Sequence, residues 1–157
     1  TDTAERLAAL EARVAELEDR EAIRNLIARY GPLADCGDAA GVAALWQEDG
    51  VYAVGGFGEH EGHDAIAALI TGPTHQHLMQ EGCAHLLGPM HIELRGDTAL
   101  AIGHSCVFRD AGKTYEAYRV SANRWELVKR AGRWRVARRS NRQLDGNEAA
   151  RALLVPG

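Results

Sequence analysis

The sequence predicts an α+β fold, with helices first and a curved, mostly antiparallel sheet after them. Apolar residues recur at helical spacing from residue 3 to about residue 34, and shorter helical patterns follow at residues 39–46 and 63–70. From about residue 84 to residue 144, strand-like segments are joined by tight turns that contain glycine. In this order of elements, the helices cover one face of the sheet. A sheet that bends around a helix encloses a cavity.

The first helix is expected to consist of two segments. One apolar stripe is made by Leu7, Leu10, Val14 and Leu17, and a second by Ile23, Leu26, Ile27 and Tyr30. The charged run at residues 16–21 separates them, because such a run rarely lies inside a core. Residues 1–16 are therefore predicted to form an accessory arm. The arm spans only two heptads, too few for an independent coiled coil, so we expect it to pack on its own subunit or on a neighbour's.

The connections between elements are predicted from glycine, proline and acidic residues. Gly31 and Pro32 are expected to end the first helix, and residues 48–50 to form a turn before a short strand at 51–54. Residues 55–62 resemble a glycine-rich loop. Long strands are expected at residues 85–94, 99–109, 114–128 and 134–142, which gives three consecutive hairpins. Residues 147–154 form a weak helical pattern within a C-terminal tail at 146–157.

Length and composition predict one domain over residues 1–157, able to bury a core without disulfides or metal. The net charge of −4 gives no attraction to nucleic acid or anionic lipid. A basic cluster between residues 129 and 142 is interpreted as a solvated hairpin face. No apolar run approaches the roughly 18 to 20 residues of a membrane span. Three separated cysteines suggest no disulfide framework, so a reducing, cytoplasmic location is expected for a protein that is neither exported nor embedded.

Several segments resemble the NTF2-like superfamily and, within it, the SnoaL-like branch that includes scytalone dehydratase, bile-acid 7α-dehydratase and hexachlorocyclohexane dehydrochlorinase. The resemblance covers about residues 17–141. It is carried by the segments EDREAIRNLIARYGPLAD, ALWQEDGVY, GHDAIAALI, AHLLGPMHIEL and GRWRVARR. The first of these, with Tyr and then Asp at the end of a helix, is the most specific. The resemblance implies an αβ cone whose wide end opens on an apolar pocket for a small hydrophobic molecule, in a dimer or trimer.

The resemblance also implies a set of site residues. Asp35 and His85 match the catalytic Asp–His pair of the dehydratases. Tyr30 and Tyr52 match tyrosines that hold the substrate, His104 lies near a second histidine of the scytalone dehydratase pattern, and Asn123 matches a polar pocket residue.

These residue types suit the abstraction of a proton next to a carbonyl group. A neutral histidine has the right basicity, and a carboxylate bonded to one ring nitrogen fixes the tautomer and stabilises the imidazolium that forms. Tyrosine hydroxyls in a dry pocket can hold the growing enolate oxygen. Such a mechanism needs no metal and no organic cofactor. His60, Glu61, His63 and Asp64, with His75 and His77, have no spacing of a closed zinc site, so no metal is expected.

The sequence leaves three functions open. The first is a cofactor-independent, dehydratase-like lyase that eliminates water or another leaving group from a small hydrophobic carbonyl compound. The second keeps the cavity but isomerises or cyclises its substrate, as ketosteroid isomerase and polyketide cyclases do. The third is a non-catalytic module that binds a small molecule, because one fold serves many functions. Taken singly, Asp35 resembles a turn residue and His85 a buried core histidine, so the catalytic interpretation rests on the pair.

Overall fold

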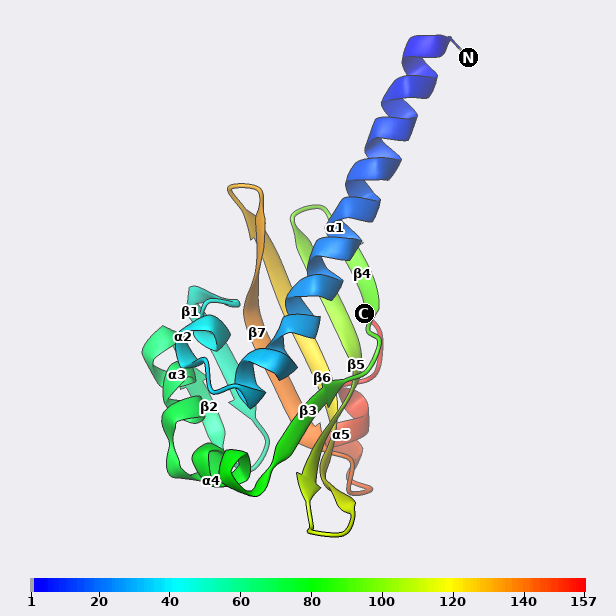
Figure 1. Cartoon of the computed structure of the whole chain (residues 1–157). Coiled ribbons are helices and arrows are strands. Elements are labelled where there is room, and N and C mark those ends of the chain that lie inside the picture. Colours follow the sequence, from blue (N-terminus) through cyan, green and yellow to red (C-terminus); the bar gives the residue numbers. More distant parts are fainter. Residues whose placement is uncertain (1) are drawn as a thin grey trace.

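The computed structural model describes residues 2–157, and its N-terminal helices lie against one face of a curved seven-stranded sheet (Figure 1). The helices are α1 (Thr3–Asp35), α2 (Ala39–Ala43), α3 (His63–Thr71), α4 (Pro73–Glu81) and α5 (Glu148–Ala152). The strands are β1 (Trp46–Val54), β2 (Gly58–Glu61), β3 (Cys83–Leu87), β4 (His91–Arg95), β5 (Thr98–Asp110), β6 (Tyr115–Arg130) and β7 (Arg133–Gln143). The predicted α+β class is confirmed. Within residues 2–157, no helix has both the length and the apolar character of a membrane span.

The sheet has the strand order β2-β1-β7-β6-β5-β3, and β4 also pairs with β5. The predicted hairpins β4–β5, β5–β6 and β6–β7 are all antiparallel, whereas β1 runs parallel to β7. Between the inner face and the helices lies a core whose most deeply buried large side chains include Ile23, Trp46, Ile66, Trp125 and Leu127. The helix α5 contacts β6 and β7, and Figure 1 shows it on the opposite face of the sheet from α1.

The first helix is continuous, and the charged run at residues 16–21 lies within it, at the junction between the exposed residues 2–18 and the part that is buried from Ile23 onward. The charged residues lie where α1 leaves the sheet, and an exposed helical turn accommodates them without interruption. The helix also continues through Gly31 and Pro32 to Asp35. Proline removes only one backbone hydrogen bond near the helix end. Asp19 is the first residue that ties α1 to the sheet, because Oδ1 of Asp19 accepts from Lys129 Nζ and Trp134 Nε1, each at 2.9 Å. Residues 2–18 are exposed.

Other boundaries and elements also differ from the prediction. The second helix ends at Ala43, and β1 begins at Trp46 and runs through the predicted turn at 48–50, where its pairing with β7 is irregular. The loop at 55–62 contains β2, which pairs with β1. The segment before β3 forms the unforeseen helix α4. The strand predicted at 85–94 is divided into β3 and β4 by the Gly88–Pro89 segment, since proline has no N–H for a ladder. The division into one domain with an arm and a tail stays a prediction.

Candidate active site

Asp35 and His85 meet where the end of α1 contacts β3. Nδ1 of His85 lies 2.6 Å from Oδ1 of Asp35. The backbone N–H of His85 also donates to the two carboxylate oxygens, at 3.1 and 3.0 Å. Asp35 therefore fixes both the backbone and the ring of the histidine. Because an ionised carboxylate only accepts hydrogen bonds, the proton of the neutral ring belongs on Nδ1, and Nε2 keeps its lone pair.

The close approach of α1 to β3 depends on Gly31. A Cβ atom at this position would lie 2.2 Å from the backbone oxygen of His85, a distance that no real contact permits. The glycine is buried in the last part of the helix. The absence of a side chain at Gly31 therefore lets the helix end rest against the strand, one turn before Asp35.

The carboxyl group of Asp35 is held in its charged form. Burial alone would raise its pKa, but the hydrogen bonds from the ring and the backbone of His85 outweigh burial and hold the pKa below the usual value of 3.8. The side chains of Asp35 and His85 are 28% and 12% exposed. An anionic acceptor thus lies behind a shielded imidazole, the arrangement that stabilises the imidazolium after proton transfer.

A second histidine, His75 of α4, lies against the first. Its ring centre is 5.3 Å from that of His85, and Nε2 of His75 lies 2.7 Å from the backbone oxygen of Ala34, to which it donates. Burial lowers the pKa of His75 below 6.5. His75 therefore presents a neutral ring that does not compete for the negative charge of Asp35.

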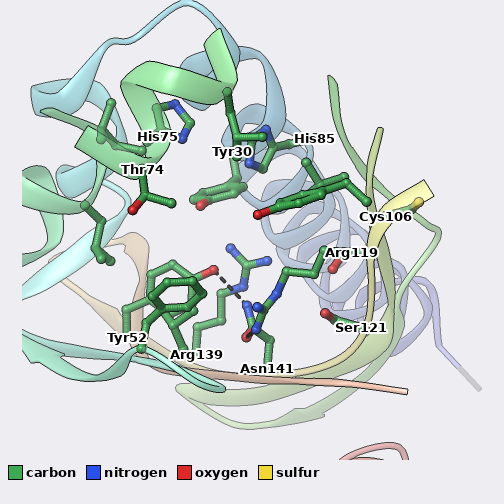
Figure 2. Close-up of a pocket in the computed structure, with 18 of the residues that line it drawn as sticks. Tyr30, Tyr52, Thr74, His75, His85, Cys106, Arg119, Ser121, Arg139 and Asn141 are labelled. Carbon is green, nitrogen blue, oxygen red and sulfur yellow. Dashed lines mark hydrogen bonds between the residues drawn. The ribbon is translucent and has the colours of Figure 1, made fainter. Parts of the chain in front are cut away.

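His75 and His85 lie at one side of a cavity of about 460 Å³, within the range of small-molecule sites, whereas Asp35 is not among the residues that line it. His75 and His85 lie across from Arg119, Arg139 and Asn141 (Figure 2). Among the other residues that line the cavity are Tyr30, Tyr52, Val54, Phe57, Leu69, Ile70, Leu78, Leu87, Val107, Tyr118 and Ser121. The cavity thus has an apolar wall and, on one side, the imidazole of His85. We call the opposite side, with the guanidinium groups of Arg119 and Arg139, the cationic floor.

The floor contains a buried arginine that the sequence analysis did not select. Arg139 of β7 is 2% exposed, and its guanidinium carbon lies 4.3 Å from the ring centre of Tyr30, 4.7 Å from Tyr52 and 4.2 Å from Trp125. Its Nε donates to Oδ1 of Asn123 at 2.9 Å. Within residues 2–157, its Nη1 has no hydrogen-bond partner and no carboxylate lies within ion-pair distance. Three aromatic rings therefore hold a cation that lacks a counter-ion.

Arg119 of β6 adds a second guanidinium to the floor. Its Nη2 donates to the backbone oxygen of Gly55 at 2.6 Å, and its guanidinium carbon lies 5.5 Å from the ring centre of Phe57. Burial, together with the positive charge of Arg139, lowers the pKa of Arg119 below its ordinary value. The two arginines thus act on each other as like charges beside the same cavity.

Asn141 orients the hydroxyl of Tyr52. Its Oδ1 accepts from the backbone N–H of Gly55 at 3.2 Å, which fixes the amide so that Nδ2 donates to the Tyr52 oxygen at 2.9 Å. Because the hydroxyl oxygen already accepts, its own proton is free to donate to a molecule in the cavity. Tyr30 lies beside it, with a ring-centre separation of 6.2 Å, and burial raises the pKa of Tyr30 far above 10, so it stays a neutral donor.

Asn123 and His104, the remaining two predicted residues, do not line the cavity either. Asn123 is fully buried below the floor, where it accepts from Arg139 and donates through Nδ2 to Ser105 Oγ at 2.6 Å. Asn123 therefore positions the arginine. His104 is exposed, because strand residues alternate between faces and its neighbour Ser105 faces the cavity. The structure thus brings together Asp35, His85, Tyr30 and Tyr52 but not His104.

Cys83 lies next to the Asp–His pair. Its Sγ is 3.8 Å from Oδ1 of Asp35, and among the described residues Asp35, Cys83 and His85 form a group with the spacing of metal ligands. Burial and the nearby carboxylate raise the pKa of the Cys83 thiol, which disfavours the thiolate that a metal requires. The His85 nitrogen and the carboxylate oxygen are also bonded to each other. These residues fit a hydrogen-bonded pair better than a metal site.

Comparisons with known proteins agree with this architecture. An NTF2-like protein with a cystatin-like fold from Novosphingobium aromaticivorans is 57% identical, over 96% of this chain and 97% of its own, with a TM-score of 0.93. A hexachlorocyclohexane dehydrochlorinase, LinA-type3 from Novosphingobium barchaimii, is 18% identical over 84% of this chain and 90% of its own, with a TM-score of 0.73. The second likeness shows the fold alone. A search of curated proteins gave no match.

Most of the chain also matches a known domain family. The SnoaL-like domain matches residues 15–140, which include the helix end with Asp35, the strand with His85 and the cationic floor. The predicted resemblance is therefore confirmed. This chain belongs to the SnoaL-like domain family and has the NTF2-like fold.

Proposed function

We propose that the protein is a cofactor-independent lyase that eliminates water or another leaving group from a small carbonyl compound with a hydrophobic body. The observation that carries the proposal is the 2.6 Å contact between His85 Nδ1 and Asp35 Oδ1 at the wall of the cavity. It supports a histidine whose other nitrogen is a base directed away from the carboxylate. The family and the dehydrochlorinase of the same fold support a lyase more than a carrier.

The proposed reaction has two steps, after which the base is restored. Nε2 of His85 takes the proton from the carbon next to the carbonyl, and that C–H electron pair forms an enolate. The enolate electrons then form a carbon–carbon double bond, while the leaving group departs from the neighbouring carbon with its bonding pair. The proton on His85 passes to a leaving hydroxide or to solvent, which restores the base. Asp35 stays ionised and stabilises the imidazolium.

The tyrosines would hold the enolate oxygen between these steps. Tyr52 is directed by Asn141 to donate its hydroxyl proton, and Tyr30 stays neutral because burial raises its pKa. Neutral donors at a developing oxyanion lower the barrier because they are oriented before the charge appears. The apolar wall excludes the water that would otherwise solvate that charge.

The test is a panel of β-hydroxy and β-halo carbonyl compounds, with release of water or halide measured for each. With any compound that reacts, we expect His85→Gln and Asp35→Asn to lower kcat by about 10²- to 10⁴-fold, the usual contribution of general base catalysis. His104→Gln is the matched control, since this histidine lies on the sheet outside the cavity. Full turnover by His85→Gln would contradict the mechanism.

The same panel separates the alternatives. An isomerase or cyclase would exchange the α-proton with deuterated solvent, in a manner that requires His85, without losing a leaving group. A binding module would take up these compounds with equal affinity in the wild-type protein and in His85→Gln and would turn over none of them.

A further inference from the structure

The floor of the cavity has the composition of an anion site. Arg139 is almost fully buried, and its Nη1, which has no hydrogen-bond partner among residues 2–157, is enclosed by the surrounding side chains. Arg119 reaches the same cavity from the neighbouring strand. No aspartate or glutamate is among the residues that line the cavity. A buried charge without a counter-ion is costly, so the positive potential of the two guanidinium groups favours a negative charge that arrives with a ligand.

We propose that the ligand of this cavity is a small carboxylate, whose anionic group lies on Arg119 and Arg139 while its apolar body faces His85 and the aliphatic wall. This inference rests on the proposed function for the direction of the reactive carbon, but the anion site itself does not require catalysis. It narrows the substrate from a neutral carbonyl compound to an acid. Guanidinium groups suit the carboxylate of such an acid because their planar N–H donors match its two oxygens.

The anionic group of the ligand and its reactive carbon would lie at opposite sides of the cavity. Figure 2 shows the two arginines across the cavity from His75 and His85, so a bound acid would place its body, rather than its carboxylate, beside the base. A carboxylate next to His85 would instead lie close to the negative charge of Asp35. The charge distribution therefore allows one orientation of an acid and disfavours the reverse.

Binding of fluorinated acids and of their amides tests the proposal by ¹⁹F NMR. The probes are 4-fluorobenzoate, 4-fluorophenylacetate and 6-fluoro-2-naphthoate, each compared with the neutral amide. We expect at least one acid to bind about 10-fold or more tightly than its amide, since hydrogen bonds to charged groups contribute about 1.5–3 kcal/mol. Arg119→Gln should remove most of that preference, and Arg119→Lys should restore part of it.

Arg138→Gln is the matched control, because Arg138 lies on β7 next to Arg139 and pairs with Glu59 outside the cavity. His85→Ala should keep the preference for acids, so loss of catalysis and loss of anion binding are separate results. The proposal is wrong if no acid binds saturably, if acids and amides bind equally, or if Arg119→Gln and Arg138→Gln have the same effect.

A second inference concerns the N-terminal part of α1, which extends beyond the sheet (Figure 1). We call its apolar residues the arm stripe: Leu7, Leu10, Val14 and Leu17. They are between 51% and 65% exposed. With 3.6 residues per turn, the arm stripe lies on the side of α1 roughly opposite Ile23, Ile27 and Tyr30, which face the sheet. A second helix could therefore lie along the arm stripe without meeting the body of its own subunit.

The charges beside the arm stripe specify what covers it. If Leu7 and Val14 are heptad positions a, then Arg6 and Arg13 occupy g and Glu11 and Glu18 occupy e. In a parallel pair of helices, each g residue faces the following e residue of the other helix, which sets arginine against glutamate. In an antiparallel pair, g faces g and e faces e, so like charges would meet. We infer that the occupant is the arm of a second copy of this chain, in parallel.

Sedimentation equilibrium of charge-reversed chains tests this pairing. Arg6→Glu with Arg13→Glu should weaken self-association by about 10-fold or more, and adding Glu11→Lys with Glu18→Lys should restore it. Lys113→Glu with Arg151→Glu makes the same change of net charge elsewhere and should have no effect. A Thr3→Cys chain should form a disulfide-linked dimer only if the arms are parallel. Unchanged association in the first variant, or no recovery in the second, would overturn the inference.

Discussion

At the scale of residues, the candidate site depends on which polar groups are charged and which are not. Asp35 is held ionised by its bonds to His85, whereas His75, a few ångströms away, is held neutral by burial. Arg139 is a cation held by aromatic rings instead of a counter-ion. The cavity therefore combines a base, its anionic support and a separate cationic floor in one small volume.

His75 predicts a pH dependence of stability. Its folded pKa lies below 6.5, so the unfolded chain binds more protons as the pH falls through about 6.5. The stability that neutral His75 provides is complete above that pH and is lost below it. We expect His75→Gln to make the free energy of unfolding depend less on pH between 7.5 and 5.5, measured by urea unfolding. His104→Gln, at an exposed histidine, should keep the wild-type slope; an equal change in both variants would contradict the argument.

At the scale of elements, two β-bulges determine that Arg119 and Arg139 face the cavity. The pairing of β6 with β7 shifts between Glu126 and Leu127, so that the buried residues of β7 are Trp134 and Val136 before the shift and Arg139 and Asn141 after it. A similar shift between Val107 and Phe108 precedes the pairing of Val107 with Arg119. Strict alternation would direct Arg138 inward instead. Such bulges re-aim side chains at sites of this kind.

The end of α1 is the other element that sets the site, and Gly31 tests it. We expect Gly31→Ala to lower the free energy of unfolding by about 1–3 kcal/mol, the usual cost of overpacking, because the new Cβ would overlap the backbone oxygen of His85. The measurement is chemical unfolding, together with the amide resonance of His85. Ala28→Gly, at an exposed position of the same helix, should cost about 1 kcal/mol and leave that resonance in place. A more stable Gly31→Ala protein would contradict the close packing.

At the scale of the whole molecule, the sequence predicts the α+β order, the hairpins and four of the residues brought to the site: Asp35, His85, Tyr30 and Tyr52. These lie in segments whose family pattern is local and specific. Arg119 and Arg139 could not be found in this way. The basic cluster at residues 129–142 looks solvated until a bulge turns Arg139 inward, and Arg119 lies on β6 outside that cluster, in a segment with no motif that marks it. His104 was predicted to bind the substrate but lies outside the cavity. A shift of one residue in a strand moves each side chain to the other face of the sheet, so the sequence alone could not place this histidine.

The proposed mechanism depends on which nitrogen of the His85 ring carries the proton. A long-range ¹H–¹⁵N spectrum of the protein with labelled histidine, recorded near pH 7.5, reports which ring nitrogen carries the proton. Because Asp35 accepts from Nδ1, we predict that His85 is protonated at Nδ1 with a free lone pair on Nε2, and that Asp35→Asn weakens this preference. A His85 ring protonated at Nε2 in the wild-type protein would leave no base facing the cavity and would contradict the account.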